Sequence, residues 1–151
     1  MVINQKRKGN NFEREAAEKL KELLDGNWKR IAGSGALGTN MQEPLLGGDL
    51  VGKIDAFPKT FRLEAKVGYG GAKQLTFQKE WLEKIRLEAE RTYSIPGVIC
   101  KFSGAKGENK YFIVLDMEAF TEIILTAEKL RKEVDKLIFE KTTKGKEKNN
   151  G

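Results

Sequence analysis

Phe61 opens a run that reads Phe-Arg-Leu-Glu-Ala-Lys-Val, and this run has the side chains with the clearest chemical potential. In an extended strand, alternate side chains point to opposite faces, so the pattern predicts Arg62, Glu64 and Lys66 on one face and apolar residues on the other. A carboxylate beside an ammonium group could supply a metal ligand and a positive charge for metal-dependent cleavage of a phosphodiester. The alternative interpretation is an ordinary charge pair on an exposed strand, which is common in a chain rich in Lys and Glu.

Further acidic residues precede this run and could complete a metal site. Cleavage requires a metal-bound water in line with the leaving oxygen, and groups that neutralise the charge developing on phosphorus. Mg²⁺ prefers octahedral oxygen ligands and keeps several waters, so two or three protein ligands suffice. We expect Asp49 and Glu64 to hold the metal, with the Ala65 carbonyl oxygen as a third ligand. Lys66 would orient the attacking water or stabilise the transition state, and Glu13 would complete the acidic cluster from a helix.

The composition limits both the reaction class and the partner. The chain has 151 residues, enough for one domain with a core, and its 28 Lys and Arg against 22 Asp and Glu favour a polyanionic partner. It has no His and a single Cys, Cys100, so Ser-His triads and zinc sites built on His or paired Cys lack their components. Cys100 lies in an apolar run, which predicts a buried, unreactive thiol.

The same features predict where the protein works. A single Cys cannot form an intrachain disulfide, so we expect a reducing, cytoplasmic location, in the host cell if the protein is viral. The sequence has no run of about 20 apolar residues, and residues 1–8 lack the apolar centre of a secretion signal. We therefore expect no association with a membrane.

The predicted elements are typical of an α/β protein with a mixed central sheet flanked by helices. Apolar residues at helical spacing predict helices over residues 10–25, 76–92 and 117–139. Runs of β-forming residues predict strands over residues 28–32, 49–57, 61–67, 98–102 and 111–115. We expect a single domain over residues 1–140 and a disordered basic tail over residues 141–151. The last helix would either cover the sheet or pair with a second copy.

Four segments, in order, resemble the archaeal-type Holliday-junction resolvases of the PD-(D/E)XK nuclease superfamily, which also has relatives in phages. The segments are Lys8-Gly9-Asn10-Asn11-Phe12-Glu13-Arg14-Glu15, Arg30-Ile31-Ala32-Gly33-Ser34-Gly35, Gly48-Asp49-Leu50-Val51 and Leu63-Glu64-Ala65-Lys66. The resemblance implies a structure-selective DNA endonuclease of recombination and repair that depends on Mg²⁺, with Mn²⁺ as a substitute. It also implies a homodimer that places two sites on opposite strands of a four-way junction.

The resemblance also implies site residues, position by position. Glu13 stands where the family has its helix-borne catalytic glutamate, and Asp49 and Glu64 stand where it has its metal carboxylates. Lys66 matches the catalytic lysine, and Ser34, in a glycine-flanked loop, matches a serine near the scissile phosphate. The positions that contact the DNA backbone in the family are occupied here by Lys6, Arg7, Lys8 and Arg30.

The chain departs from the family pattern in spacing, and this leaves alternatives open. The connection over residues 35–48 and the interval over residues 49–64 are longer than in a typical archaeal member. Asp55 is therefore an alternative to Asp49, because both have the same parity on a regular strand and would point to the same face. We favour Asp49 because, as in the family, it opens its strand before an apolar pair. At the level of function, the alternatives are a nuclease acting on another branched or duplex DNA, and a DNA-binding module without catalysis.

Overall fold

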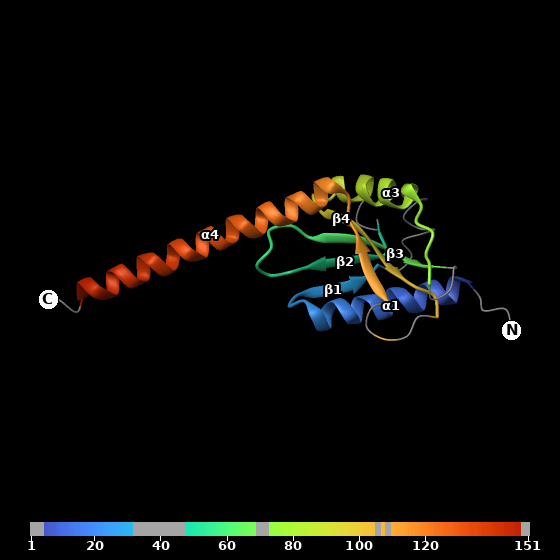
Figure 1. Ribbon diagram of the computed structural model, residues 1–151, viewed down its shortest axis with the longest axis horizontal. Coiled ribbons are helices and arrows are strands. Elements are labelled where there is room, and N and C mark those ends of the chain that lie inside the picture. The colour runs from blue at the N-terminus through green and yellow to red at the C-terminus, as the bar shows by residue number, and fades with distance from the viewer. Residues whose placement is uncertain (1–4, 32–47, 69–72, 105–106, 108–109, 149–151) are drawn as a thin grey trace. The chain divides into compact units, whose positions relative to one another are not determined.

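The computed structural model describes residues 5–31, 48–68, 73–104, 107 and 110–148, and side chains are described for residues 7–144 of these ranges (Figure 1). Two compact units make up the chain, Met1–Ala119 and Phe120–Gly151. The helices and strands are α1 (Gln5–Leu23), β1 (Asn27–Arg30), β2 (Leu50–Lys53), β3 (Phe61–Val67), α3 (Lys79–Glu90), β4 (Ile95–Lys101), β5 (Tyr111–Val114) and α4 (Met117–Lys148). No helix in the described residues is long and apolar enough to span a membrane.

The five strands form one mixed sheet in the order β1-β2-β3-β4-β5. Neighbouring strands are antiparallel except β3 and β4, which run parallel and are joined by a connection that contains α3. A parallel pair needs such a long crossover because a tight turn can join only antiparallel strands. This arrangement confirms the predicted fold class, a mixed sheet flanked by helices.

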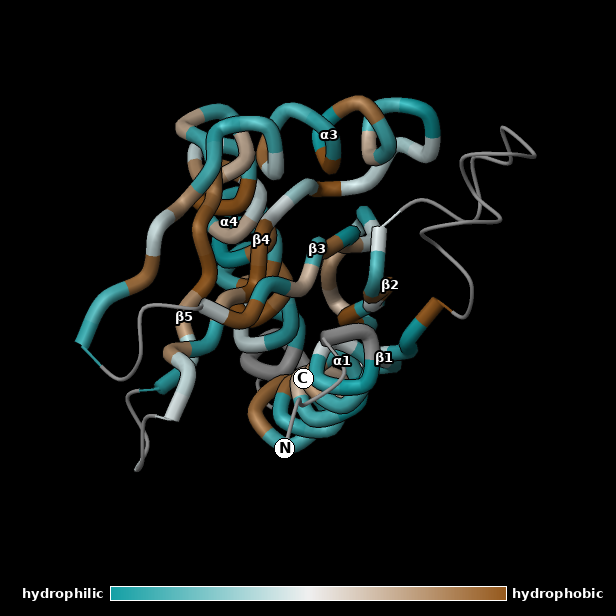
Figure 2. Tube along the Cα trace, turned by 90° about the vertical axis from the view of Figure 1, so that its right-hand side faces the viewer, coloured by the Kyte–Doolittle hydropathy of each residue, from teal (hydrophilic) through white to brown (hydrophobic). Residues whose placement is uncertain are grey.

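The unit Met1–Ala119 contains the sheet and is called the sheet unit. In it, α1 and α3 cover opposite faces of the sheet (Figure 2). On the α1 face the buried core consists of Phe12, Ala16, Ala17, Leu20, Trp28, Leu50, Leu63 and Ile99. On the α3 face it consists of Ile85, Val98 and Cys100, with Leu75, Phe77, Trp81, Leu82, Phe112 and Val114 packed against them. Ile99 and its neighbours on β4 thus alternate between the two layers, as the pleat of a strand requires.

Strand β3 is buried on both faces, which the alternating pattern does not predict. Arg62, Leu63 and Glu64 are all less than 5% exposed. The alternation itself holds, since Leu63 packs on the α1 face while Glu64 and Lys66 contact residues of α3. The charged face of β3 therefore lies beneath α3, and an open surface charge pair is excluded.

Several element boundaries differ from those predicted. β2 ends at Lys53, and a turn follows in which the Phe57 N–H donates to the Ile54 carbonyl at 2.9 Å, so residues 54–57 are not strand. α1 begins at Gln5, five residues before the predicted start. α4 continues to Lys148, so residues 141–148 are helical where a disordered tail was predicted. This segment has no proline, and its four Lys and one Glu are good helix formers.

Candidate active site

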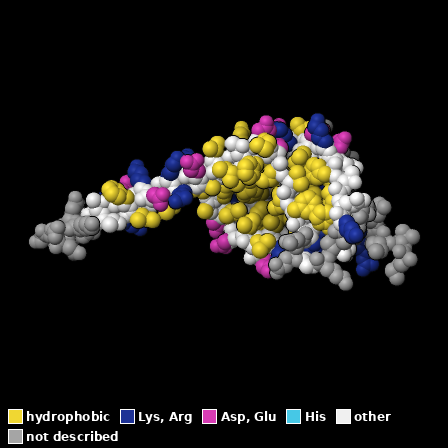
Figure 3. All heavy atoms as spheres, viewed as in Figure 1, with side chains coloured by type: hydrophobic (Ala, Val, Ile, Leu, Met, Phe, Trp, Pro, Cys, Tyr) yellow, Lys and Arg dark blue, Asp and Glu magenta, His cyan; other side chains and the backbone are white. Residues whose placement is uncertain are grey.

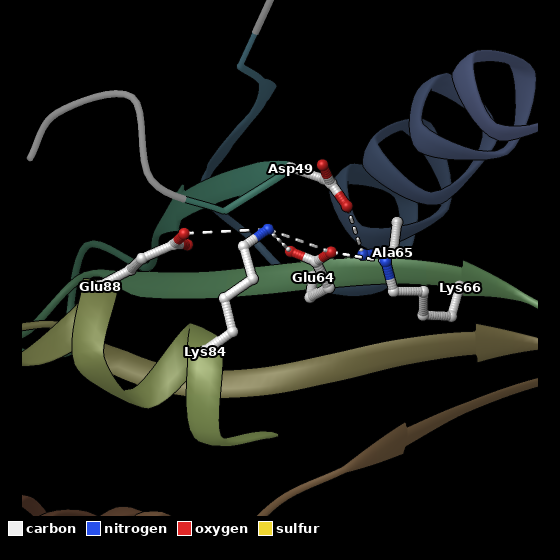
Figure 4. A network of polar contacts seen from close by, with 6 residues as sticks. All are labelled: Asp49, Glu64, Ala65, Lys66, Lys84 and Glu88. Atoms are coloured by element: carbon white, nitrogen blue, oxygen red, sulfur yellow. Dashed lines mark hydrogen bonds and ion pairs between the residues drawn. The ribbon is translucent and has the colours of Figure 1, made fainter. Parts of the chain in front are cut away.

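Asp49 lies immediately before β2 and is held by strands on both sides. The Ile31 N–H donates to the Asp49 carbonyl at 2.9 Å, and the Asp49 N–H donates to the Leu63 carbonyl at 3.0 Å. The carboxylate Oδ2 accepts a hydrogen bond from the Ala65 N–H at 2.8 Å (Figure 4). Asp49 is thus bonded to both chain neighbours of Glu64, which places the two acidic residues side by side.

Glu64 is a buried carboxylate that is compensated by two ammonium groups. Its side chain is 4% exposed, and its Oε1 accepts a hydrogen bond from Lys66 Nζ at 2.6 Å. Its Oε2 lies 3.3 Å from Lys84 Nζ (Figure 4). A buried carboxylate is costly unless it is paired and hydrogen-bonded, so these contacts offset the cost of burying Glu64.

Lys84, on α3, is the residue of this site that the sequence did not reveal. Its Nζ contacts Glu64 and lies 3.8 Å from Glu88 Oε1, one helical turn along α3. Burial disfavours the ammonium charge, but the negative charges of Glu64, Glu88 and Asp49 outweigh burial and raise the pKa of Lys84. In the sequence, Lys84 and Glu88 are only a common (i, i+4) helix pair, which gives no sign that the lysine reaches the sheet.

Lys66 is positioned by an aromatic ring as well as by Glu64. Its Nζ lies 5.5 Å from the centroid of the Trp81 ring, within the range of a cation–π contact. Trp81 packs against the core on the α3 face. Cys100, the predicted inert thiol, is buried in the same layer. Burial raises the pKa of its thiol to about 11, although the positive charge of Lys66 acts to lower it. It is therefore protonated and unreactive near neutral pH.

Glu13 forms an ion pair with a basic side chain. Arg30 on β1 donates from its Nε to Glu13 Oε2 and from an Nη to Asn10 Oδ1, the latter at 2.9 Å. Two residues predicted to have separate roles, metal binding and DNA contact, therefore form an ion pair. Among the side chains that the structure describes, no group of three or more Asp, Glu or Cys could hold a metal ion, so Glu13 does not complete a cluster here.

The remaining predicted residues have different settings. Asp55 lies in the exposed turn after β2, whereas Asp49 contacts β3. Lys8 Nζ donates to Ser103 Oγ at 2.8 Å, and Arg7 is exposed on α1. Ser34 and the side chain of Lys6 lie outside the described residues.

The donor set that the structure brings together fits a divalent ion that prefers oxygen. Asp49, just before β2, and Glu64, on β3, offer carboxylate oxygens, and the main chain of Ala65 lies between Glu64 and Lys66. Mg²⁺ is typically held by one or two carboxylates and completes its octahedron with water, so a third acidic side chain is not required. Hard oxygen ligands without His or Cys suit Mg²⁺ and Mn²⁺ better than Zn²⁺.

Comparison with known proteins gives the family. A solved structure similar to this chain is that of Archaeoglobus fulgidus Hjc, a Holliday junction resolvase from an archaeal hyperthermophile, with 18% sequence identity and a TM-score of 0.46. The similarity covers 72% of this chain and 84% of that one. No curated protein sequence matches the chain significantly. The model of the family described as "phage putative PDDEXK endonuclease" matches residues 4–150, so the chain belongs to this family of PD-(D/E)XK nucleases.

Proposed function

We propose that this nuclease is a metal-dependent, structure-selective DNA endonuclease that resolves four-way junctions by paired nicking. The observation that supports it best is the side-by-side placement of Asp49 and Glu64, with Lys66 bonded to Glu64, in a chain of an endonuclease family. Junction selectivity is supported by the four ordered motifs shared with the archaeal-type resolvases. No element in the part of the chain that the structure describes resembles a base-reading element, so selectivity would come from shape and backbone contacts.

In this proposal the chain binds one Mg²⁺, or Mn²⁺ in its place, through Asp49, Glu64 and the Ala65 carbonyl oxygen. The bound ion would supply a water of lowered pKa and neutralise charge on the scissile phosphate. The hydrogen bond from the Ala65 N–H orients the Asp49 carboxylate, so that ligand is preorganised. Lys66, held by Glu64 and Trp81, would direct its ammonium group to the developing negative charge.

The proposal also assigns roles around this centre to the other predicted residues. Glu13 would act from α1, with Arg30 holding its carboxylate until DNA phosphate competes for the guanidinium. Ser34 would approach the scissile phosphate. Basic side chains would contact the DNA backbone, which gives a salt-dependent, sequence-independent affinity. These basic residues are Lys6, Arg7, Lys8 and Arg30.

A homodimer is part of the proposal because resolution requires two nicks on opposite strands. Apolar side chains left exposed in the sheet unit are consistent with a second copy. Ile113, on the edge strand β5, is 46% exposed, and hydrophobic side chains gather on the face shown in Figure 3. Contiguous exposed apolar surface commonly marks an interface. The protein would work in the cytoplasm, that of the host cell if it is viral, in recombination or repair of DNA.

Cleavage of a synthetic four-way junction, compared with matched flap, nicked and duplex DNA, tests the proposal. With Mg²⁺ we expect paired nicks in the junction and much slower cutting of the other substrates, and we expect Glu64→Gln to abolish the product. Equal cutting of all four would leave a nuclease but defeat the resolvase assignment. Magnesium-independent binding with no product, unchanged by Glu64→Gln, would identify a binding module instead.

A further inference from the structure

The ammonium group of Lys84 lies between two sets of carboxylates (Figure 4). On one side its Nζ is 3.3 Å from Glu64 Oε2 and 3.5 Å from Glu64 Oε1. The negative charge of Asp49 also stabilises the ammonium form. On the other side it is 3.8 Å from Glu88 Oε1. Lys84 therefore neutralises the same pair of acidic residues that would bind the metal ion.

A lysine in this position competes with a divalent cation. Each places positive charge on the oxygens of Glu64, and an ammonium group left beside a bound divalent ion would be repelled by it. Lys84 can move away, since its side chain is 50% exposed and ends a flexible four-carbon stem. Lys66 differs, because its ammonium group is 2.6 Å from Glu64 and is also held over the Trp81 ring.

Glu88 offers the displaced ammonium group a second position. It lies one turn further along α3, and its side chain is 20% exposed. Its Oε2 is buried, and within the described part of the chain it has no hydrogen-bond partner. A buried carboxylate oxygen in this state gains by accepting a hydrogen bond, so a small movement of Lys84 toward Glu88 would be favourable once Glu64 is occupied.

We propose that Lys84 is an internal counter-cation, which pairs with Glu64 beside Asp49 before the metal binds and moves to Glu88 when it does. This inference rests on the proposed function, because it takes Asp49 and Glu64 as the metal ligands. Without a metal, Lys84 compensates the charge of Glu64, and in doing so it lowers the affinity of the site for a divalent ion. Glu88 has the opposite effect, since it stabilises the position of Lys84 in which the site is open.

Titration of the full-length protein with Mn²⁺, with free ion followed by electron paramagnetic resonance, tests this directly. Lys84→Met is expected to lower the Kd for Mn²⁺ about tenfold, equivalent to about 1.4 kcal/mol. Glu88→Gln is expected to raise it, because Lys84 then stays on Glu64. In the double variant the Glu88 effect should vanish, because no ammonium group remains to be relocated.

Lys79→Met is the matched control, since it removes the same charge from the same helix at a residue that contacts Glu83 at 2.8 Å instead. Thermal unfolding in EDTA should show a lower Tm for Lys84→Met but a larger rise on adding Mn²⁺. If Lys84→Met does not fold, Lys84→Gln replaces it in both measurements.

The outcomes separate this inference from the function on which it rests. If Glu64→Gln leaves Mn²⁺ binding unchanged, the proposed metal site fails and Lys84 loses its role with it. If Glu64→Gln abolishes binding but Lys84→Met and Lys84→Gln bind no more tightly than Lys79→Met, only the counter-cation is overturned. If Glu88→Gln weakens binding equally with and without Lys84, relocation to Glu88 is overturned.

Discussion

The Ala65 N–H donates a 2.8 Å hydrogen bond to the Asp49 carboxylate, and this bond joins the acidic residue before β2 to the strand that contains Glu64 and Lys66. It connects residues that are far apart in the chain through a side chain, at the point where the regular β2-β3 pairing ends. Asp49 thereby gains a fixed orientation beside Glu64, whereas Asp55 lies in an exposed turn. This difference favours Asp49 over Asp55 as the metal ligand, a choice that strand parity alone could not make.

Asp49→Asn should abolish Mg²⁺-dependent cleavage, whereas Asp55→Asn should leave it within about twofold of wild type. The loss at Asp49 is expected to be at least about 100-fold, because a charged ligand is removed and its hydrogen bond to Ala65 is weakened. Rates of junction cleavage under single-turnover conditions measure both variants. The opposite ranking would transfer the ligand role to Asp55.

Gly52→Ala should destabilise the sheet. A Cβ at Gly52 would lie 2.1 Å from Trp28 Cε3, on the cross-strand partner of this glycine, so the buried ring would have to shift. We expect a loss of about 1–3 kcal/mol in the free energy of unfolding, measured by urea denaturation. Gly9→Ala is the control, since a Cβ there meets nothing within 4 Å in α1 and should stabilise the helix by roughly 0.5–1 kcal/mol. Equal effects at both glycines would contradict the steric account.

Glu15 should contribute stability that disappears in acid. Burial raises the pKa of its carboxyl group, but hydrogen bonds from Lys101 and Tyr111 and the charges of Lys101 and Lys110 outweigh burial and lower the pKa below its ordinary value of 4.5. A lowered pKa favours the folded state above pH 4.5, and this contribution is lost as the pH falls through the folded pKa.

Glu15→Gln therefore should lower the Tm at pH 7 and have progressively less effect below pH 4.5. The expected loss at pH 7 is about 1 kcal/mol or less, since the Glu15 side chain is 36% exposed. Thermal unfolding of both proteins between pH 7 and pH 3 measures the difference. Glu18→Gln, whose carboxylate pairs with Lys21 at the surface, is the control. A Tm difference that is constant across this range would refute the ion-pair account.

Cys100 should resist thiol reagents in the folded protein. A thiol pKa of about 11 rather than 9.0 lowers the thiolate fraction at pH 8 about 100-fold, and burial hinders access further. Reaction with a chromogenic disulfide should be slow in native protein and fast in urea. Rapid native labelling would mean that the α3 face of the sheet opens readily.

Much of the fold follows from local pattern, and the site follows only in part. β3 was predicted residue for residue, since its alternation is regular and a turn precedes it. The roles of Lys84 and Arg30 were not predictable in the same way. Lys84 reaches Glu64 because the β3-β4 crossover lays α3 across the sheet, and Arg30 reaches Glu13 because α1 packs beside β1. Such contacts depend on packing between elements, which no periodicity within one segment specifies.

The central claim is that Asp49 and Glu64 together bind one divalent ion. Anomalous diffraction at the manganese edge, from crystals of the wild-type protein grown with Mn²⁺, locates that ion directly. We predict a peak coordinated by carboxylate oxygens of both Asp49 and Glu64, which is absent from crystals of Glu64→Gln. A peak bound by other carboxylates, or one that survives that substitution, would contradict the claim.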